Sequence, residues 1–254
     1  MDVARKAASL AGAQASYDGR DFYRIADVLE PHERAIVDRV RLLMESEVAP
    51  IINDYWAKAK FPFEVVPKLS ELGIAGTAFE GFGCPGGTDV LNGFISMEMA
   101  RVDPSIATFF GVHSGLAMGS VYLCGSDEQR HRWLPAMARL DKIGAFGLTE
   151  PEVGSGAAGG LTTTARREGD HWLLNGQKKW IGNATFADLI VIWARDEATN
   201  QVKGFVVEKG APGFKAEKIE NKIALRVVQN ALITLTDCRV AEADRFLRPK
   251  CARI

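Results

Sequence analysis

The feature that most constrains the fold is a change in the spacing of apolar residues after residue 142. Before that position apolar residues recur every three or four residues, which is typical of one face of an α-helix. After it they alternate with polar residues or form short continuous runs, which is typical of β-strands. Helices and strands are therefore segregated along the 254-residue chain. This segregation predicts an α+β fold of two domains rather than an alternating α/β sheet.

The predicted elements divide the chain into four segments. We expect an N-terminal extension over 1–24, an all-helical domain over 25–142, a middle β domain over 143–245 and a tail over 246–254. Helices are predicted over 36–48, 63–72, 90–101 and 127–140, and strands over 162–165, 172–177, 189–194, 204–208 and 231–240. Asn175 and Gly176 have the composition of a two-residue hairpin turn inside one of these strand segments.

A run without charged residues separates Asp103 from Asp127. Gly111, Gly115 and Gly119 are spaced four apart in it, as in packed transmembrane helices. Length alone favours a membrane span, but a proline opens the run and several polar residues dilute its hydrophobicity. We therefore predict a buried core helix and no membrane span, with the glycines marking the close approach of a neighbouring backbone.

Composition and motifs exclude several function classes. Lys plus Arg number 31 against 32 Asp plus Glu, so no basic field predicts a nucleic-acid partner. The four cysteines are scattered without a C-x-x-C pair, and no metal site is predicted. G-x-G-x-x-G occurs at 81–86 and 154–159, but neither copy has the strand before it and the helix after it that dinucleotide binding requires. Hydrolase motifs such as G-x-S-x-G are absent from the sequence.

Two stretches of the β half carry the features of a binding site. Residues 145–155 (AFGLTEPEVGS) and 175–183 (NGQKKWIGN) place small, hydroxylated and aromatic residues at strand ends. Such positions can offer backbone N–H groups and hydroxyls to a planar polar ring, with an indole packed against its face. Ordinary turns remain the alternative, because Pro151 and Gly154 are common turn residues and Trp180 could belong to the core.

The patterns F-G-L-T-E-P-x-x-G-S and N-G-x-K-x-W-I-x-N in these stretches resemble the signatures of the acyl-CoA dehydrogenase and acyl-CoA oxidase flavoproteins. Shorter matches in the same order extend the resemblance from about Asp21 to Arg245, and the plant short-chain acyl-CoA oxidases and the glutaryl-CoA dehydrogenase branch look most similar. The resemblance implies an N-terminal helical domain, a middle β-barrel-like domain and a C-terminal four-helix domain. It also implies FAD as the cofactor and a homo-oligomer, which is usually a tetramer in this family.

The resemblance also implies roles for individual residues. Thr149 would hydrogen-bond the pyrimidine side of the isoalloxazine, Trp180 would cover a face of the ring, and Ser155 would contact the phosphate region. Gly182 and Asn183 would lie near flavin N5. The complete set of implied cofactor contacts is Phe146, Leu148, Thr149, Gly154, Ser155, Trp180, Ile181, Gly182 and Asn183. The implied substrate contacts are Thr108 and Ser155.

The activity implied by the resemblance is FAD-dependent α,β-dehydrogenation of short straight-chain acyl-CoA thioesters in fatty acid β-oxidation, in the mitochondrial matrix or the peroxisome. Ala107 stands where the glutaryl-CoA branch has an arginine, which disfavours a dicarboxylyl substrate. Gly182 stands where many dehydrogenases have a threonine, and the plant-type oxidases share the Trp-Ile-Gly-Asn pattern. The electron acceptor, O₂ or an electron-transfer flavoprotein, stays open.

The chain also departs from the family pattern. The family's catalytic glutamate belongs to the C-terminal helical domain, which should begin near Arg245, whereas this sequence ends at Ile254. We therefore expect no catalytic residue here and no dehydrogenation by this chain alone; the alternative is a non-catalytic truncated subunit or assembly partner of a full-length relative. Ala224 replaces a glycine usual in the family, and a left-handed backbone at that position would cost roughly 1 kcal/mol or more.

Overall fold

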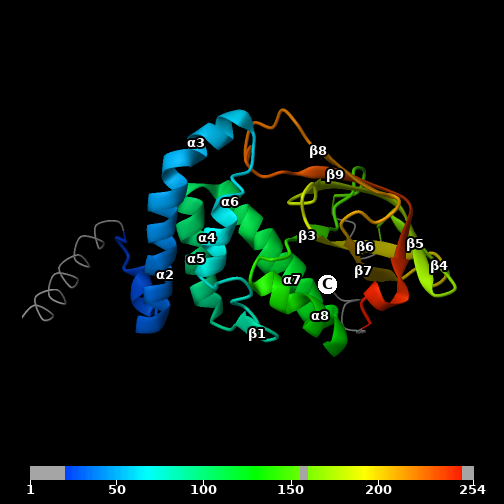
Figure 1. Cartoon of the computed structure of the whole chain (residues 1–254), viewed down its shortest axis with the longest axis horizontal. Coiled ribbons are helices and arrows are strands. Elements are labelled where there is room, and N and C mark those ends of the chain that lie inside the picture. The colour runs from blue at the N-terminus through cyan, green and yellow to red at the C-terminus, as the bar shows by residue number, and fades with distance from the viewer. Residues whose placement is uncertain (1–20, 155–159, 248–254) are drawn as a thin grey trace, which may run out of the picture.

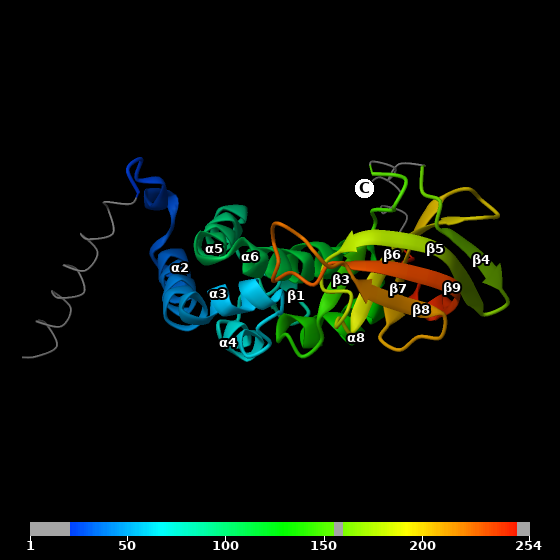
Figure 2. The ribbon, with the colours of Figure 1, turned by 90° about the horizontal axis from the view of Figure 1, so that it is seen from above.

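Helices form the first half of the chain and a curled β-sheet the second, as Figures 1 and 2 show for this computed structural model. The structure describes residues 21–154 and 160–247. The predicted α+β class is confirmed, because helical and β domains lie side by side and follow each other in sequence.

The helical domain consists of seven described α-helices joined by shorter elements. The helices are α2 (Pro31–Leu43), α3 (Ala49–Lys58), α4 (Val65–Glu71), α5 (Asp89–Val102), α6 (Pro104–Phe110), α7 (Met118–Cys124) and α8 (Asp127–Ala138). Two π-helical turns, η2 (Met44–Val48) and η3 (Gly111–Ala117), continue neighbouring helices, and η1 (Ile25–Val28) is a short 3₁₀ helix. The helix starts follow local chemistry: Thr88 and Asp103 cap α5 and α6, and Ser126 with Gln129 forms a capping box on α8.

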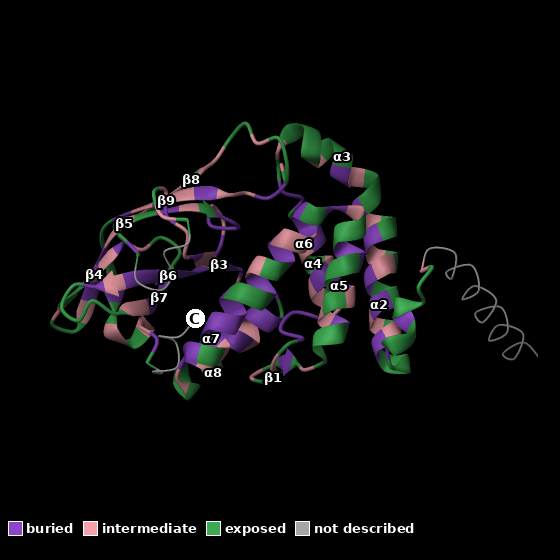
Figure 3. Ribbon diagram, turned by 180° about the vertical axis from the view of Figure 1, so that it is seen from behind, coloured by how far each residue is buried: buried purple, intermediate pink, exposed green. Residues whose placement is uncertain are grey.

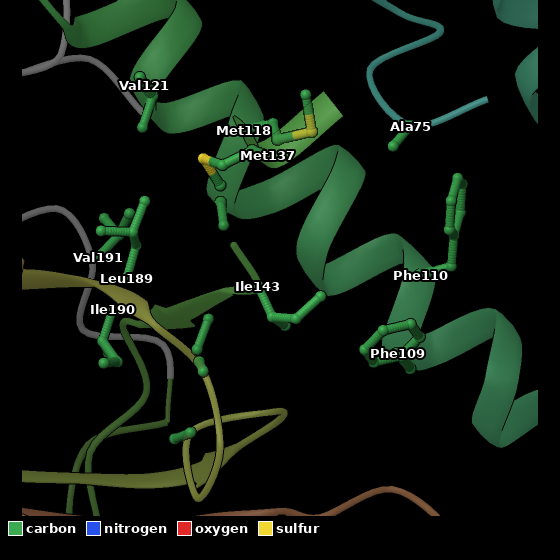
Figure 4. Packing of buried hydrophobic residues seen from close by; sticks show 14 of the residues in the cluster. Ala75, Phe109, Phe110, Met118, Val121, Met137, Ile143, Leu189, Ile190 and Val191 are labelled. Atoms are coloured by element: carbon green, nitrogen blue, oxygen red, sulfur yellow. The ribbon is translucent and has the colours of Figure 1, made fainter. Parts of the chain in front are cut away.

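The uncharged run forms one continuous helix, Pro104–Cys124, built from α6, η3 and α7. It is 21 residues long with a mean hydropathy of 1.3, and among the described residues it is the one helix long and apolar enough to cross a membrane. In the fold it packs between the other helices and the sheet: its middle part, η3, contacts β3, and Figure 4 shows the helix across from Ile143 and the β6 residues Leu189–Val191. The burial pattern in Figure 3 shows this helix at the centre of the molecule.

Of the three glycines expected to mark a close approach, only Gly119 does: it is buried, and a Cβ atom on it would lie 3.2 Å from the ring of Phe79. Gly111 and Gly115 are exposed, and a Cβ atom on either would meet nothing within 4 Å. A closer approach lies at Gly144, where a Cβ atom would be 2.5 Å from the Cβ of Ala117. Gly144 opens β3, so the sheet rather than a second helix needs the small residue.

The β domain is a seven-stranded sheet organised around β6. Its strands are β3 (Gly144–Gly147), β4 (Thr164–Glu168), β5 (His171–Ile181), β6 (Leu189–Asp196), β7 (Val202–Glu208), β8 (Phe214–Lys218) and β9 (Ala231–Ala241). β7 pairs antiparallel with β6, and β3 and β4 both pair with it in parallel, at Leu189–Ile192 and at Arg195–Asp196. β3 and β4 therefore follow each other along β6: the chain leaves the sheet after Gly147 and re-enters it at Thr164.

The predicted hairpin turn at Asn175–Gly176 is wrong. β5 continues through it and pairs with β9 on both sides of a register shift between Leu174 and Gly176. Gly176 is required by a close approach, because a Cβ atom there would be 2.7 Å from the Cα of Thr163. Asn175 exchanges two hydrogen bonds with Asp237 on β9, which fixes the bulge.

The backbone answers two further questions that the sequence raised. The first G-x-G-x-x-G copy, 81–86, lies in a small hairpin of β1 (Glu80–Gly81) and β2 (Cys84–Pro85), not in a phosphate-binding strand–turn–helix. Ala224 does not have a left-handed backbone; the next residue, Leu225, does, with φ 48°. The glycine-to-alanine difference at 224 therefore carries no left-handed penalty.

Candidate functional site

The two stretches singled out in the sequence come together at neighbouring strand ends. Residues 148–150 continue from the end of β3, and the last residues of β5 run beside them. The backbone N–H of Lys179 donates to the carbonyl oxygen of Thr149 at 2.9 Å. The site is therefore a seam between two chain segments about thirty residues apart, which only the sheet pairing brings into contact.

The Thr149 side chain has no hydrogen-bond partner among the described residues. This side chain is half-buried, and within 21–154 and 160–247 its hydroxyl makes no hydrogen bond. Phe146 and Leu148 beside it are also half-buried, and Phe146 meets the ring of Trp193 edge-on at 6.3 Å between centroids. A hydroxyl that is partly shielded and unpaired between apolar neighbours is suited to a ligand that accepts or donates a hydrogen bond.

Trp180 is held outward by an unusual backbone. Its φ is 65°, and its side chain is 53% exposed although it lies near the end of β5, between the buried residues Lys178 and Ile181. Left-handed backbone at an aromatic residue costs about 1–3 kcal/mol and persists only where the surrounding structure holds it in place. Asn230 holds this backbone by donating to the Trp180 carbonyl at 3.1 Å. An indole face and an unpaired hydroxyl at adjoining strand ends fit a planar heterocyclic ring such as an isoalloxazine.

The three residues after Trp180 face the protein. Ile181 is buried, and a Cβ atom on Gly182 would lie 3.2 Å from Val112 of η3. Asn183 is 1% exposed with φ 67°, and its amide donates to the carbonyl oxygens of Phe109 and Gly144. Asn183 thus joins the long helix to β3. Cofactor contacts by these three residues stay a prediction.

The other sequence-predicted contacts are less informative. Thr108 is half-buried on α6, one residue before Phe109, and its hydroxyl donates to the Pro104 carbonyl at 2.8 Å. Gly154 is exposed in the loop after β3. Ser155 lies outside the described residues. No group of three His, Cys, Asp or Glu side chains with metal-binding geometry occurs in the described ranges.

Sequence reasoning missed a buried ion pair beneath the site. Lys178 on β5 and Glu150 after β3 are both fully buried, with Nζ and Oε1 2.8 Å apart. Both residues belong to the quoted motifs, but neither was assigned a role. Charged residues at inward-facing positions next to apolar neighbours were the available signal, because such charges are buried only when paired.

The titratable side chains of Glu150 and His113, which are buried near the seam, already use their polar atoms in hydrogen bonds within the protein. Burial would raise the pKa of Glu150, but hydrogen bonds from Lys178, Thr162 and Thr163 outweigh it and lower the pKa to about 2. Burial lowers the pKa of His113 to about 4. His113 is therefore a neutral ring at pH 7, and its two nitrogens bond the N–H of Gly144 and the carbonyl of Met137. Neither group is available to take a proton from a ligand.

Comparison with known proteins agrees with this arrangement. The family described as Acyl-CoA dehydrogenase, N-terminal domain, matches residues 30–141, and Acyl-CoA dehydrogenase, middle domain, matches residues 145–238. Among curated proteins, a mitochondrial short-chain specific acyl-CoA dehydrogenase of Rattus norvegicus is 32% identical, covering 97% of this chain and 61% of that protein. A short-chain specific acyl-CoA dehydrogenase of Clostridium acetobutylicum is 34% identical over 82% of this chain and 56% of its own length.

Solved structures give the same result. A glutaryl-CoA dehydrogenase of Mycobacterium smegmatis in complex with FADH2 has 35% identity and a TM-score of 0.84, covering 88% of this chain and 57% of that chain. A butyryl-CoA dehydrogenase of Megasphaera elsdenii has 27% identity and a TM-score of 0.80, covering 87% and 59%. The chain spans less than two thirds of the length of these relatives and matches their N-terminal and middle domains. It belongs to the acyl-CoA dehydrogenase family.

Proposed function

We propose that this chain supplies the FAD-binding and acyl-CoA-binding surfaces for the α,β-dehydrogenation of short straight-chain acyl-CoA thioesters. The observation that carries the proposal is the pairing of the unpartnered Thr149 hydroxyl with the strained, outward Trp180 at one seam. The names of the short-chain specific and butyryl-CoA relatives support the substrate class. Ala107, which carries no charge for a distal carboxylate, supports a monocarboxylic acyl group.

In this proposal the protein orients the cofactor and keeps water from its ring. The Thr149 hydroxyl would bind the polar edge of the isoalloxazine, Trp180 would cover one face, and Phe146 and Leu148 would line the apolar side. FAD, when bound, supplies the acceptor for the hydride that leaves the β-carbon. The surrounding side chains contribute binding and orientation rather than chemistry of their own.

We assign no base to the described residues. Glu150 and His113 have their polar atoms engaged, and the carboxylate of Asp188 accepts from the N–H of Ile143 at 2.8 Å. Removal of the α-proton would need a carboxylate brought by the family's helical third domain, in the same or another chain. We therefore propose that the 254-residue chain binds FAD but does not turn over alone.

The test is made on the purified 254-residue chain incubated with FAD and gel-filtered. We expect retained visible flavin absorbance, a strong loss of it in Thr149→Ala, and no dye reduction with butyryl-CoA. Perturbation of the flavin spectrum by butyryl-CoA but not by glutaryl-CoA would support the substrate class. A chain that stays colourless at saturating FAD would refute the cofactor assignment, and dye reduction at rates typical of the family would refute the missing base.

A second candidate function is assembly with a longer relative. Leu116 and Leu123 on the long helix and Ile223 in the loop after β8 are exposed apolar side chains. Exposed apolar residues of this size favour a partner surface when they are contiguous. Mixed oligomers with a full-length acyl-CoA dehydrogenase, formed by colourless chain, would favour this function over the first.

For localisation we propose the mitochondrial matrix. The relatives from rat, mouse, human and cattle are named mitochondrial. This favours the mitochondrion over the peroxisome in a eukaryotic host. Co-fractionation of the native protein with matrix markers would support the assignment, and co-fractionation with peroxisomal markers would overturn it.

A further inference from the structure

The buried pair of Lys178 and Glu150 lies directly behind the seam that the proposed function uses. Lys178 Nζ donates to Glu150 Oε1 at 2.8 Å and to the Leu148 carbonyl at 3.0 Å. Both side chains are fully buried. The ammonium group therefore connects the strand that carries Trp180 with the backbone that precedes Thr149.

Glu150 extends this connection to the start of β4. Its carboxylate accepts from the N–H and the hydroxyl of Thr162, each at 2.6 Å, and from the N–H of Thr163 at 2.9 Å. These are the residues at which the chain re-enters the sheet beside β6. One carboxylate thus ties the end of β3 to the approach of β4, and one ammonium ties both to β5.

The same pair explains why Trp180 can point outward. Lys178 and Trp180 are two residues apart, so an undistorted strand would turn both toward the same face of the sheet. Instead Lys178 is buried and Trp180 is 53% exposed. The pairing with β9 shifts register between Lys178 and Ile181, and the left-handed backbone of Trp180 falls within that shift. A buried anchor before the distortion lets the chain turn the indole outward without losing its place in the sheet.

We propose that the Lys178–Glu150 pair is a positioning device that sets the Thr149 hydroxyl and the Trp180 indole at a fixed separation for the flavin ring. This inference rests on the proposed function. Replacing a buried ion pair by apolar groups is often neutral or stabilising, so stability alone gives no reason for a pair here. Fixed geometry does give a reason, because the hydrogen bonds of both charged groups go to the segments that flank the seam.

The central experiment compares Lys178→Met, the double variant Lys178→Met/Glu150→Gln, and Lys203→Met in the full chain. Lys203 makes an ion pair with Asp196 in the β6–β7 hairpin and contacts neither Leu148 nor Glu150, so it controls for the general loss of a lysine pair. The single Lys178 variant leaves a buried charge unpaired and is expected to melt at a lower temperature. The double variant leaves no such charge and should melt at a higher temperature than the single variant, although the one acceptor oxygen of glutamine cannot accept from all the groups that donate to Glu150.

Hydrogen exchange gives a readout that needs no cofactor. The Lys179 amide, which bonds the Thr149 carbonyl, should exchange at least tenfold faster in the double variant than in wild type, and at the wild-type rate in Lys203→Met. Equal exchange rates of the Lys179 amide in wild type, the double variant and Lys203→Met would overturn the inference. This outcome is independent of whether FAD binds.

Flavin binding gives the second readout. We expect the double variant to bind FAD at least tenfold more weakly, with a shifted visible absorption maximum, while Lys203→Met stays within twofold and keeps the wild-type spectrum. Wild-type affinity and spectrum in the double variant would overturn the inference, as would an equal loss in Lys203→Met. A wild-type chain that binds no FAD would refute the proposed function instead. The exchange rate of the Lys179 amide would then show whether the Lys178–Glu150 pair fixes the seam.

Discussion

Replacing Asn183 should weaken the attachment of the helical domain to the sheet and so lower the free energy of unfolding by a measurable amount. Its side-chain amide donates to the Phe109 carbonyl at 3.1 Å and to the Gly144 carbonyl at 3.2 Å, and it is 1% exposed. Alanine would remove both bonds, at about 1 kcal/mol each. Alanine would also sit at φ 67°, where it costs about 1 kcal/mol more than asparagine. The free energy of unfolding should fall by about 3 kcal/mol in total.

The assay is urea unfolding followed by tryptophan fluorescence, with a thermal melt alongside. A loss of about 3 kcal/mol corresponds to a lowering of the melting temperature by roughly 6–12 °C for a chain of this size. Asn221→Ala is the matched control, because Asn221 is exposed, has φ 58°, and makes no side-chain hydrogen bond among the described residues. It should lose only about 1 kcal/mol. Equal losses for the two variants would refute the role of the Asn183 amide.

Three further predictions concern the same region. Gly182→Thr should lower the free energy of unfolding by about 1–3 kcal/mol, because its Cβ would lie 3.2 Å from Val112. In a thermal melt, adding Val112→Ala should recover part of this loss. No recovery would contradict the packing of Gly182 against Val112. Burial lowers the pKa of His113 to about 4, so between about pH 6.5 and 4 the unfolded chain binds a proton at this residue that the folded chain does not bind. The free energy of unfolding should therefore fall by about 2 kcal/mol from pH 7 to pH 5 because of His113. His113→Gln should flatten that part of the urea-midpoint profile, and an unchanged slope would exclude His113 as its source. Trp180→Gly should melt no lower than wild type, since it relieves a left-handed aromatic residue, yet bind FAD at least tenfold more weakly; wild-type affinity in this variant would separate the indole from the cofactor.

Local patterns predicted the elements with strong periodicity. Helix 90–101 corresponds to α5 (Asp89–Val102), and strand 189–194 to β6 (Leu189–Asp196). These segments have one clear face or one continuous apolar run, so their period alone identifies them. β8 (Phe214–Lys218) was missed because it is a five-residue edge strand with only two apolar residues, although its exposure alternates along its whole length.

The predictions made for glycine residues failed because they depend on which distant segments lie close to each glycine in the folded chain. Gly176 looked like a turn residue, but the structure shows that it is small because Thr163 passes within 2.7 Å of where its Cβ would be. Gly111 and Gly115 looked like packing residues, but they are exposed. In each case the sequence shows a glycine without showing which segment, if any, comes close to it.

The candidate site was predictable only through its motifs. The residues of 145–155 and 175–183 were recognised as a pair, but their contact through Lys179 and Thr149 depends on the order of strands in the sheet. The pairing of Lys178 with Glu150 depends on the same order. Ion pairs between segments distant in sequence leave no local spacing from which a partner could be named.

The central claim is that the seam between Thr149 and Trp180 receives the flavin ring. Hydrogen exchange of the full chain with and without saturating FAD tests it most directly. The account predicts slower exchange in the backbone amides of residues 146–150 and 179–182, and unchanged exchange in the hairpin at 81–86. Protection at 81–86, or FAD binding that leaves 146–150 and 179–182 unprotected, would contradict it.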